Sequence, residues 1–359
     1  MDTQVAVMAE DVVQVDHAAP AVSICIPTYN GVRYLRPCIE SAVNQTVEDI
    51  EVLVVDDAST DGTSVIVNEF VSRDQRVRLI QNKTNLGLVP NWNQSIMHAR
   101  GTWIKLLFQD DTLDARCVQR LLEHATGDGS RIVGCFRNFI FEPDFLKSSE
   151  ELYPNNRARI AERFGRGSLT TAEIAECAID HLGDNFFGEP IVSLIHRQVF
   201  ETVGYFDPAL TQMCDTEFWI RAGIHFGLSM VQEDLATYRV HGATTSAHNY
   251  ARRAYANEWL DQIVLLHHYL FDPFYEPLRV IARRGRKLRR LEGWFWDTCH
   301  YAHSISLSAV GEEGEQIRRD WEGVAKLYPR ITDVPAGKTM SRWVRHLKRF
   351  PTRWYGRPR

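Results

Sequence analysis

Residues 52–55 form an uninterrupted apolar run, Val-Leu-Val-Val, which ends at the adjacent aspartates Asp56 and Asp57. A strand with one face in water alternates apolar and polar residues, whereas a strand covered on both faces is apolar throughout. Apolar residues at helical spacing come before and after this run. The run therefore predicts a buried strand of a parallel sheet that has helices on both faces.

Strand and helix patterns continue to alternate on either side of this run. Strands are expected at residues 22–26, 52–55, 77–80 and 103–108, and the intervals between them carry helical patterns. Strands that alternate with helices at this spacing form βαβ units. The fold class predicted for this part of the chain is therefore α/β, Rossmann-like, with a mostly parallel sheet.

Connections become longer in the second half of the chain. Residues 142–167 are polar and predict an irregular loop, and Thr170 with Glu173 predicts a capping box at a helix start. Strands are expected at 191–195 and 235–240, with a helix at 215–226 between them.

After about residue 250 the sequence shows helical patterns only. We therefore predict three regions. Residues 1–20 form a flexible N-terminal tail, residues 21–249 form the α/β domain, and residues 250–359 form a helical C-terminal extension.

Composition excludes several classes of protein. Hydrophobic residues make up 44% of the chain, which is enough to bury a large core and argues against wholesale disorder. The net charge of −5 argues against a dedicated nucleic-acid binder. No apolar run reaches the roughly 18 residues of a membrane span, and residues 1–20 lack a secretory signal pattern. We expect a cytoplasmic protein.

The last 19 residues, 341–359, are basic and rich in aromatic side chains. They contain seven Lys or Arg residues and no acid, and Trp343, Val344 and Leu347 fall on one side of a short helix that Pro351 ends. This pattern is typical of segments that lie on an anionic membrane surface. The alternative is that the aromatic residues pack on the α/β domain of residues 21–249 and the arginines are solvated.

Polar residues follow three of the expected strands. They occupy residues 27–31, 56–62 and 109–111, and the last two segments contain Asp-Asp pairs. In open α/β sheets, ligands bind beyond the carboxyl ends of the strands. Neighbouring carboxylates repel one another unless a cation or hydrogen-bond donors lie between them, and a hard divalent metal on substrate phosphates meets that need. Either pair taken alone is more often a turn or a helix cap.

Other well-known catalytic patterns are missing from the sequence. It has no G-x-G-x-x-G or G-x-x-x-x-G-K-[ST], which removes support for dinucleotide and P-loop phosphate sites. It also lacks H-E-x-x-H and the nucleophile elbow G-x-S-x-G.

Several segments in register resemble the nucleotide-sugar-dependent glycosyltransferases of family 2, which have the GT-A fold. The likeness covers about residues 21–245 and weakens after 120. The matching positions are residues 22–30, Leu35, 41–46, 51–63, 85–87, Asn93, 99–101 and 109–111.

The resemblance implies a nucleotide-sugar site made by Pro27, Thr28, Tyr29, Asn30, Asp57, Asn85 and Asp110. Asp57 would accept a hydrogen bond from N3–H of uracil or thymine. Tyr29 would stack on the base or line its pocket. Asp56 would support the loop instead of contacting the nucleotide.

The resemblance also implies a divalent metal, Mg²⁺ or Mn²⁺, at Asp111, Asp110 and His241. One aspartate would coordinate the metal on the diphosphate, and its neighbour would hold the ribose or support the site. Many relatives have an acid two positions before Asp110, where this chain has Phe108. This departure leaves the choice between the two aspartates open. His241 would complete the metal or diphosphate shell, or be a structural histidine.

Residues 215–221, Asp-Thr-Glu-Phe-Trp-Ile-Arg, resemble the family's second motif, whose first acid is the catalytic base. Asp215 takes that role by position, and the alternative is that it caps its helix. Glu217 points to another side of the helix. Glu189 is expected near the acceptor or donor. Lys105 would contact a phosphate of the donor, or be a solvated lysine on an edge strand.

These assignments imply inverting transfer of a hexose-type sugar from a UDP- or dTDP-sugar to a hydroxyl of a glycan or polyprenyl-linked acceptor. Surface polysaccharide biosynthesis is the expected context, with the enzyme peripheral on the inner face of the cytoplasmic membrane. Two rivals stay open: a nucleotidyltransferase, and a non-catalytic scaffold or binding protein. A nucleotidyltransferase would need a basic, glycine-rich triphosphate loop after the first strand. A scaffold would not need the aspartates at positions 57, 110, 111 and 215, which are all present.

Overall fold

A computed structural model of the 359-residue chain describes residues 19–142, 153–242 and 255–333. In these ranges the strands join in one nine-stranded sheet, in the order β3-β2-β1-β4-β8-β6-β9-β5 with β7 beside β9. The strands are β1 (Val22–Thr28), β2 (Ile50–Asp56), β3 (Val77–Gln81), β4 (Trp103–Leu106), β5 (Thr112–Leu113), β6 (Ile132–Phe141), β7 (Ser168–Leu169), β8 (Ser193–His196) and β9 (Leu228–Val240).

The first four long strands, β3-β2-β1-β4, pair in parallel, with helices in the connections between them. Every residue of β1 and β2 is buried. These connecting helices are α1 (Leu35–Val43), α2 (Thr63–Val71) and α3 (Leu88–His98). The prediction of buried parallel strands with crossover helices is therefore confirmed.

Antiparallel pairs appear in the second half of the sheet. β8 lies antiparallel between β4 and β6, β6 and β9 are parallel, and β5 and β7 are antiparallel to β9. The sheet is thus mixed but mostly parallel, as predicted. The helices here are α4 (Cys117–Asp128), α6 (Tyr153–Arg163), α7 (Thr171–Asp180), α8 (Arg197–Val203) and α9 (Cys214–Phe226), with a short turn η2 (Pro190–Val192).

Two features of this half differ from the sequence-based prediction. Residues 153–163, expected in an irregular loop, form α6, whose polar sequence is anchored in the core by Ile160. β6 was not among the predicted strands. Its first six residues are buried and the rest alternate, so Arg137 and Asn138 interrupt the apolar pattern midway. The capping box of Thr170 and Glu173 is present at the start of α7.

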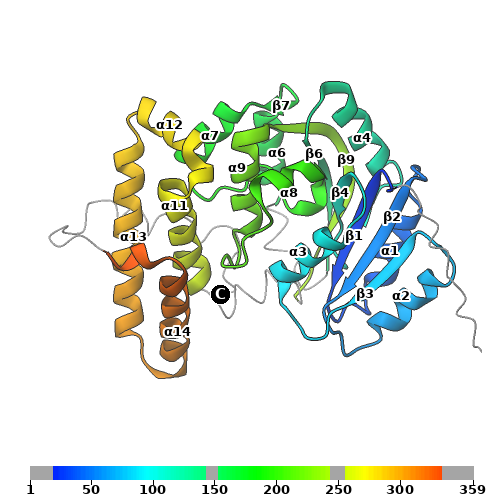
Figure 1. Ribbon diagram of the computed structural model, residues 1–359, viewed down its shortest axis with the longest axis horizontal. Helices are drawn as coiled ribbons and strands as arrows, with labels where there is room; N and C mark the ends of the chain where they lie inside the picture. The colour runs from blue at the N-terminus through cyan, green and yellow to red at the C-terminus, as the bar shows by residue number, and fades with distance from the viewer. Residues whose placement is uncertain (1–18, 143–152, 243–254, 334–359) are drawn as a thin grey trace, which may run out of the picture.

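Residues 255–333 contain helices and no strand, so the helical C-terminal region is confirmed. Its elements are η3, a π-helix (Ala256–Leu260), α11 (Asp261–Phe271), η4 (Pro273–Tyr275), α12 (Glu276–Arg284), α13 (Leu288–Ser308), α14 (Gly311–Leu327) and η5 (Pro329–Thr332). α13 packs on α11 and α14, and α12 packs on α7 and α9. Figure 1 shows this lobe beside α7 and α9, away from β1–β3.

The predicted limits of the three regions stay predictions. Residues 1–18 and 243–254, which bear on both boundaries, lie outside the described residues. Among the helices that the structure describes, none combines the length and the apolarity that crossing a bilayer requires.

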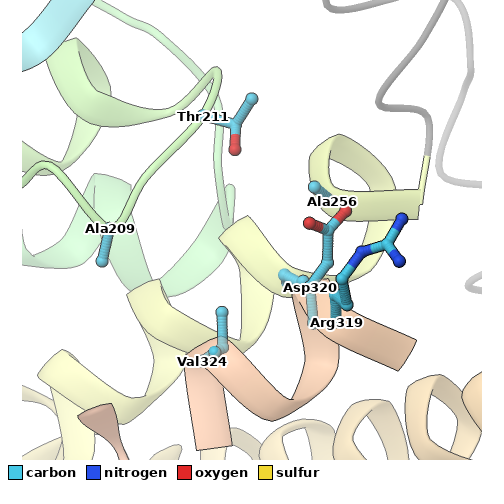
Figure 2. Close-up of a pocket in the computed structure, with 8 residues that line it drawn as sticks. Ala209, Thr211, Ala256, Arg319, Asp320 and Val324 are labelled. Carbon is cyan, nitrogen blue, oxygen red and sulfur yellow. The ribbon is translucent and has the colours of Figure 1, made fainter. Parts of the chain in front are cut away.

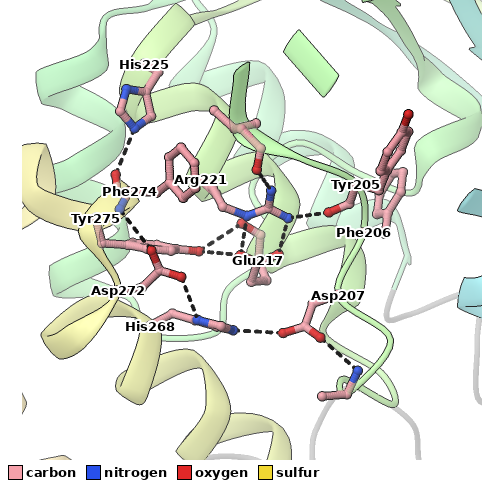
Figure 3. A network of polar contacts seen from close by, with 12 residues as sticks. Tyr205, Phe206, Asp207, Glu217, Arg221, His225, His268, Asp272, Phe274 and Tyr275 are labelled. Carbon is pink, nitrogen blue, oxygen red and sulfur yellow. Dashed lines mark hydrogen bonds and ion pairs between the residues drawn. The ribbon is translucent and has the colours of Figure 1, made fainter. Parts of the chain in front are cut away.

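A buried polar network joins α9 to the C-terminal helices (Figure 3). On α9, Arg221 Nε lies 2.6 Å from Glu217 Oε1, and the two side chains form an ion pair. The hydroxyl of Tyr275 donates to the same oxygen at 2.6 Å. His268 of α11 lies 2.8 Å from Asp207. Although burial opposes it, hydrogen bonding to carboxylates raises the pKa of His268 to about 9, so this histidine is charged at neutral pH. The position of α9 therefore depends on contacts with the C-terminal region.

Candidate active site

The turn after β1 is held by the side chain of Gln109, which follows β4. Its Oε1 accepts hydrogen bonds from Thr28 Oγ1 at 2.6 Å and from the Tyr29 amide at 2.8 Å, and its Nε2 donates to the Tyr29 carbonyl at 3.2 Å. A Cβ on Gly31 would lie 2.5 Å from Gln109 Oε1, so a larger residue at position 31 would displace the Gln109 side chain that holds this turn. Pro27 and Thr28 are buried, while the ring of Tyr29 is 45% exposed above them.

The turns after β1 and β2 bind each other. The Asn30 amide donates to Ser59 Oγ at 2.8 Å, and the Thr60 amide donates to Asn30 Oδ1 at 2.9 Å. Asn30 and Ala58 have positive φ angles of 48° and 59°, a backbone region that costs free energy for residues with a side chain. Strain that neighbouring hydrogen bonds stabilise is common at binding sites.

Asp57 organises the loop that follows β3. Its Oδ1 accepts from Asn82 Nδ2 at 2.8 Å and from the Leu86 amide at 2.9 Å, and its Oδ2 accepts from the Gly87 amide at 2.9 Å. A carboxylate has about four acceptor positions, so Oδ2 keeps one. Asn85 lies exposed on the same loop.

The side chain of Asp56 binds the loop after β2 and not the loop after β3. Its Oδ1 accepts from the Ser59 amide at 3.2 Å and also from the Ser59 hydroxyl, so it supports the loop after β2.

The turn after β4 brings Asp110 and Asp111 against the end of β9. Asp110 Oδ2 lies 3.0 Å from His241 Nε2, and Asp111 Oδ1 accepts from the Arg239 amide at 2.8 Å. The guanidinium of Arg239 lies over the ring of Tyr34, 4.9 Å from its centroid. Burial and the neighbouring charge of Asp110 raise the pKa of Asp111 well above its usual range.

The carboxylates of this turn, together with His241, offer the ligand atoms that a divalent cation needs. Asp111 Oδ2 and His241 Nδ1 are buried and have no hydrogen-bond partner within the described residues. In the described ranges, no three His, Cys, Asp or Glu side chains form a ready-made cage. Mg²⁺ and similar ions are commonly held by one or two carboxylates together with substrate phosphates, so such a cage is not required. The unpartnered oxygen of Asp111 beside Asp110 therefore fits a metal bound together with a diphosphate.

Asp215 is the second residue of α9 and is partly exposed. Its Oδ2 accepts from Asn185 Nδ2 at 2.8 Å, and its Oδ1 accepts from the Thr216 amide at 2.6 Å. Met213 occupies the N-cap position, so the alternative that Asp215 caps the helix is wrong. Burial, together with the charge of Glu189, raises the pKa of Asp215 to about 7. A carboxyl with this pKa can accept and release a proton near neutral pH.

Glu189 is paired with Arg137 of β6, and the distance from Arg137 Nε to Glu189 Oε2 is 2.5 Å. Its negative charge contributes to the raised pKa of both Asp111 and Asp215. Gly188 has a φ of 118°, and a Cβ there would lie 2.9 Å from Arg137 Nη1. The Gly188 carbonyl accepts from Trp219 Nε1 of α9 at 2.7 Å, which fixes this loop against the helix of Asp215.

Lys105 lies apart from these groups. It is fully buried in β4, and its ammonium donates to the Ile191 carbonyl. Because β4 lies between β1 and β8 inside the sheet, the alternative of a solvated lysine on an edge strand is wrong.

Sequence reasoning missed four side chains of this site as site residues: Gln109, Arg137, Asn185 and Arg239. Gln109 and Arg239 stand next to residues of recognised motifs, which was a usable signal. Arg137 and Asn185 lie in segments whose structure was not predicted.

A family comparison places this geometry among known proteins. The family described as glycosyl transferase family 2 matches residues 23–179. The chain carries a family 2 glycosyltransferase domain. The matched residues hold the loops after β1, β2 and β4, whereas Glu189, Asp215 and His241 lie beyond them.

Curated relatives of this chain differ in the share of their length that it covers. It is 27% identical to "Uncharacterized protein MT1568" of Mycobacterium tuberculosis over 74% of this chain and 80% of the relative. It is 36% identical to chondroitin synthase of Pasteurella multocida over 44% of this chain, but over only 16% of that protein.

Solved structures with the same fold include two that were determined with nucleotides. The chain superposes on TarS residues 1–349 of S. aureus in complex with UDP with a TM-score of 0.54 and 17% identity, over 91% of this chain and 87% of that chain. For the mannosyltransferase PcManGT of Pyrobaculum calidifontis with GDP-Man and Mn²⁺, the TM-score is 0.53 at 16% identity, over 88% and 84% of the two chains. The GT-A fold predicted from the sequence is thereby confirmed.

Proposed function

We propose that this chain is an inverting glycosyltransferase that moves a sugar from a UDP- or dTDP-sugar to a hydroxyl of a glycan or polyprenyl-linked glycan. The observation that carries the proposal is the state of Asp215. Its carboxyl is partly exposed, has a pKa of about 7, and is influenced by the charge of Glu189, which also acts on Asp111 in the turn after β4. A base poised at neutral pH, next to a turn suited to a diphosphate, fits hydroxyl transfer to a nucleotide sugar.

The loops after β1, β2 and β3 are the proposed nucleotide pocket. The exposed ring of Tyr29 offers a surface for the base, and the free acceptor position of Asp57 Oδ2 suits N3–H of uracil or thymine. Asn30 and Asn85 are proposed sugar or ribose contacts. The TarS complexes with UDP and with UDP-GlcNAc support a uridine donor on the same fold.

The reaction follows from one base and one displacement. Asp215 takes the proton of the acceptor hydroxyl, and the hydroxyl oxygen attacks the anomeric carbon as the bond to the nucleoside diphosphate breaks. Attack from the face opposite the leaving group inverts the anomeric configuration, and no covalent intermediate on the protein is needed. Glu189, held by Arg137, is proposed to face the acceptor or the donor sugar.

Asp110, Asp111 and His241 are the proposed residues that hold Mg²⁺ or Mn²⁺. When bound, the cation would neutralise charge on the leaving diphosphate. The unpartnered Asp111 Oδ2 supports this assignment, as does the Mn²⁺ in the PcManGT complex.

Release of nucleotide from a panel of UDP-, dTDP- and GDP-sugars, with Mn²⁺ and with EDTA, tests the proposal. We expect metal-dependent release of UDP or dTDP from at least one donor, and little release from GDP-sugars. Tight binding without turnover of any donor would favour a scaffold protein. Pyrophosphate-forming activity with a nucleoside triphosphate would favour a nucleotidyltransferase.

The turnover number should rise with pH through a midpoint near 7. Asp215 must be deprotonated to act as a base, and burial with the charge of Glu189 raises its pKa to about 7. Below the midpoint, the rate should fall about tenfold per pH unit. Glu189→Gln removes a charge that raises this pKa, so its profile should shift to lower pH. A profile that stays flat from pH 5 to 9 would contradict Asp215 as the base.

Peripheral membrane attachment through residues 341–359 is also proposed, and this segment lies outside the described residues. Its seven basic residues, at roughly 1 kcal/mol each near an anionic surface, would hold the enzyme there reversibly. The full chain should sediment with anionic liposomes at low salt and be released at high salt. The chain truncated after residue 340 should stay in the supernatant. Full-length protein that stays in the supernatant at low salt would refute the attachment.

A further inference from the structure

The loop in front of the proposed catalytic base is held by a carboxylate from the C-terminal helical region. Asp261, the first residue of α11, accepts three backbone hydrogen bonds from this loop. The Thr211 amide donates to Oδ1 at 2.9 Å, and the amides of Gln212 and Met213 donate to Oδ2 at 2.5 and 2.9 Å. Asp261 is 1% exposed, so these charge-assisted bonds are shielded from water.

The three bound amides lead directly into α9. Met213 is the N-cap of α9 and has no side-chain cap bond, and Asp215 follows two residues later. The first amides of a helix need acceptors, and a negative charge is stabilising at this end. Asp261 supplies that charge from a separate part of the chain, 46 positions after Asp215.

A second path runs from the same loop to Asp215. A Cβ on Gly183 would lie 2.7 Å from Met213 Cε, so the Met213 side chain packs on the loop that begins at Gly183. This loop carries Asn185, whose Nδ2 donates to Asp215 Oδ2 at 2.8 Å. The position of Met213 therefore affects the backbone that leads to Asp215 and also the placement of Asn185, its hydrogen-bond partner.

The loop 211–213 borders a small cavity. A cavity of about 190 Å³ lies beside it, lined by Ala209, Thr211, Ala256, Leu260, Arg319, Asp320, Gly323 and Val324. Figure 2 shows Thr211 on one side of this space and Asp320 of α14 on the other. Thr211 thus lines this space while its amide is bound by Asp261. The π-helix η3 ends immediately before Asp261 and gives α11 an irregular first turn.

We propose that Asp261 is a positioning residue that holds the loop 211–213, and through it Asp215, in the geometry needed for proton transfer. This inference rests on the proposed function. It also assigns a role to the C-terminal helices, which complete the active site of the glycosyltransferase domain from outside the residues that match the family.

Three variants test this role: Asp261→Ala, Asp261→Asn and the control Tyr255→Phe. Tyr255 is buried in the same helical region, and its hydroxyl donates to the Ala302 carbonyl at 2.9 Å, so the control removes a buried bond that does not involve the loop. Asp261→Ala should lower kcat by about 10²-fold, as misplacement of a reacting group does, with the donor KM and the Kd of UDP nearly unchanged. Asp261→Asn keeps one acceptor oxygen and should lower kcat less. Tyr255→Phe should keep the wild-type kcat.

Two further readouts separate positioning from simple loss of stability. In Asp261→Ala, the pH midpoint of kcat should move to lower pH, because a loosened loop lets water reach Asp215. Amide hydrogen exchange at residues 211–213 should accelerate in this variant and not in Tyr255→Phe. A folded Asp261→Ala protein with wild-type kcat and exchange would overturn the proposal. So would a loss of kcat accompanied by an equal loss of UDP affinity.

These outcomes distinguish the inference from the proposed function. If Asp215→Asn abolishes turnover and the Asp261 variants do not lower it, only the positioning role fails. If wild type releases nucleotide from no donor, the proposed function fails, and if wild type and Asp215→Asn release nucleotide equally, Asp215 is not the base.

Discussion

Asp215→Asn is expected to lower the rate of sugar transfer by about 10²–10⁴-fold, the usual contribution of a general base. Asparagine has the shape of aspartate but only one acceptor oxygen, so it can keep the contact with either Asn185 or Thr216, and it can no longer take a proton. The Kd of UDP should stay nearly unchanged, because the proposed nucleotide pocket lies at the loops after β1, β2 and β3. Rates are measured with a donor found by the panel, and affinity is measured by calorimetry.

Asp184→Asn is the matched control for this variant. Asp184 precedes Asn185 on the same loop, but within the described residues its carboxylate binds Arg163 at 2.8 Å and makes no hydrogen bond with Asp215. The control should turn over at nearly the wild-type rate. Wild-type transfer by Asp215→Asn, or loss of UDP binding in a folded variant, would remove Asp215 from the mechanism.

Asp111→Asn is expected to lower turnover by about 10²–10³-fold, the effect of losing one group that stabilises developing charge. The amide oxygen can still accept from the Arg239 backbone, but the second carboxylate oxygen, which is buried and unpartnered, is lost. Wild type should bind UDP more tightly with Mn²⁺ than with EDTA. The variant should bind UDP with the same affinity in both.

Asp114→Asn provides the control for the metal prediction. Asp114 lies three residues after Asp111, is exposed and accepts a hydrogen bond from the Arg116 amide at 2.9 Å, so its replacement leaves the proposed metal ligands in place. Its affinity for UDP should keep the wild-type response to Mn²⁺. Equal UDP affinity of the wild-type protein with Mn²⁺ and with EDTA would show that the metal assignment is wrong.

The first half of the fold was predictable because its patterns are local. The apolar run 52–55 predicts a buried parallel strand, and the structure has it as β2 beside β1 and β3. β6 was missed because a polar pair, Arg137 and Asn138, interrupts an otherwise apolar segment, and the pairing with β9 overrides the weak pattern. α6 was missed because its sequence is polar. Its place in the fold is set by Ile160, which is buried in the core.

The proposed site, like the fold, has a part that could be predicted from the sequence and a part that could not. Asp57, Asp110 and Asp111 follow expected strands, so their meeting at one sheet edge could be anticipated. The pairing of Glu189 with Arg137 could not, because it joins a turn to a strand that was not predicted. The bonds from Asp261 to residues 211–213 join two segments that no motif links, so only the tertiary structure reveals them.

The anomeric configuration of the released sugar tests the central claim most directly. Proton NMR can follow an α-linked nucleotide sugar with the enzyme and Mn²⁺, with water as the acceptor, at times shorter than mutarotation. One base and one displacement predict that the β-anomer appears first, and that Asp215→Asn suppresses it. Initial release of the α-anomer would contradict the single-displacement account with Asp215 as its base.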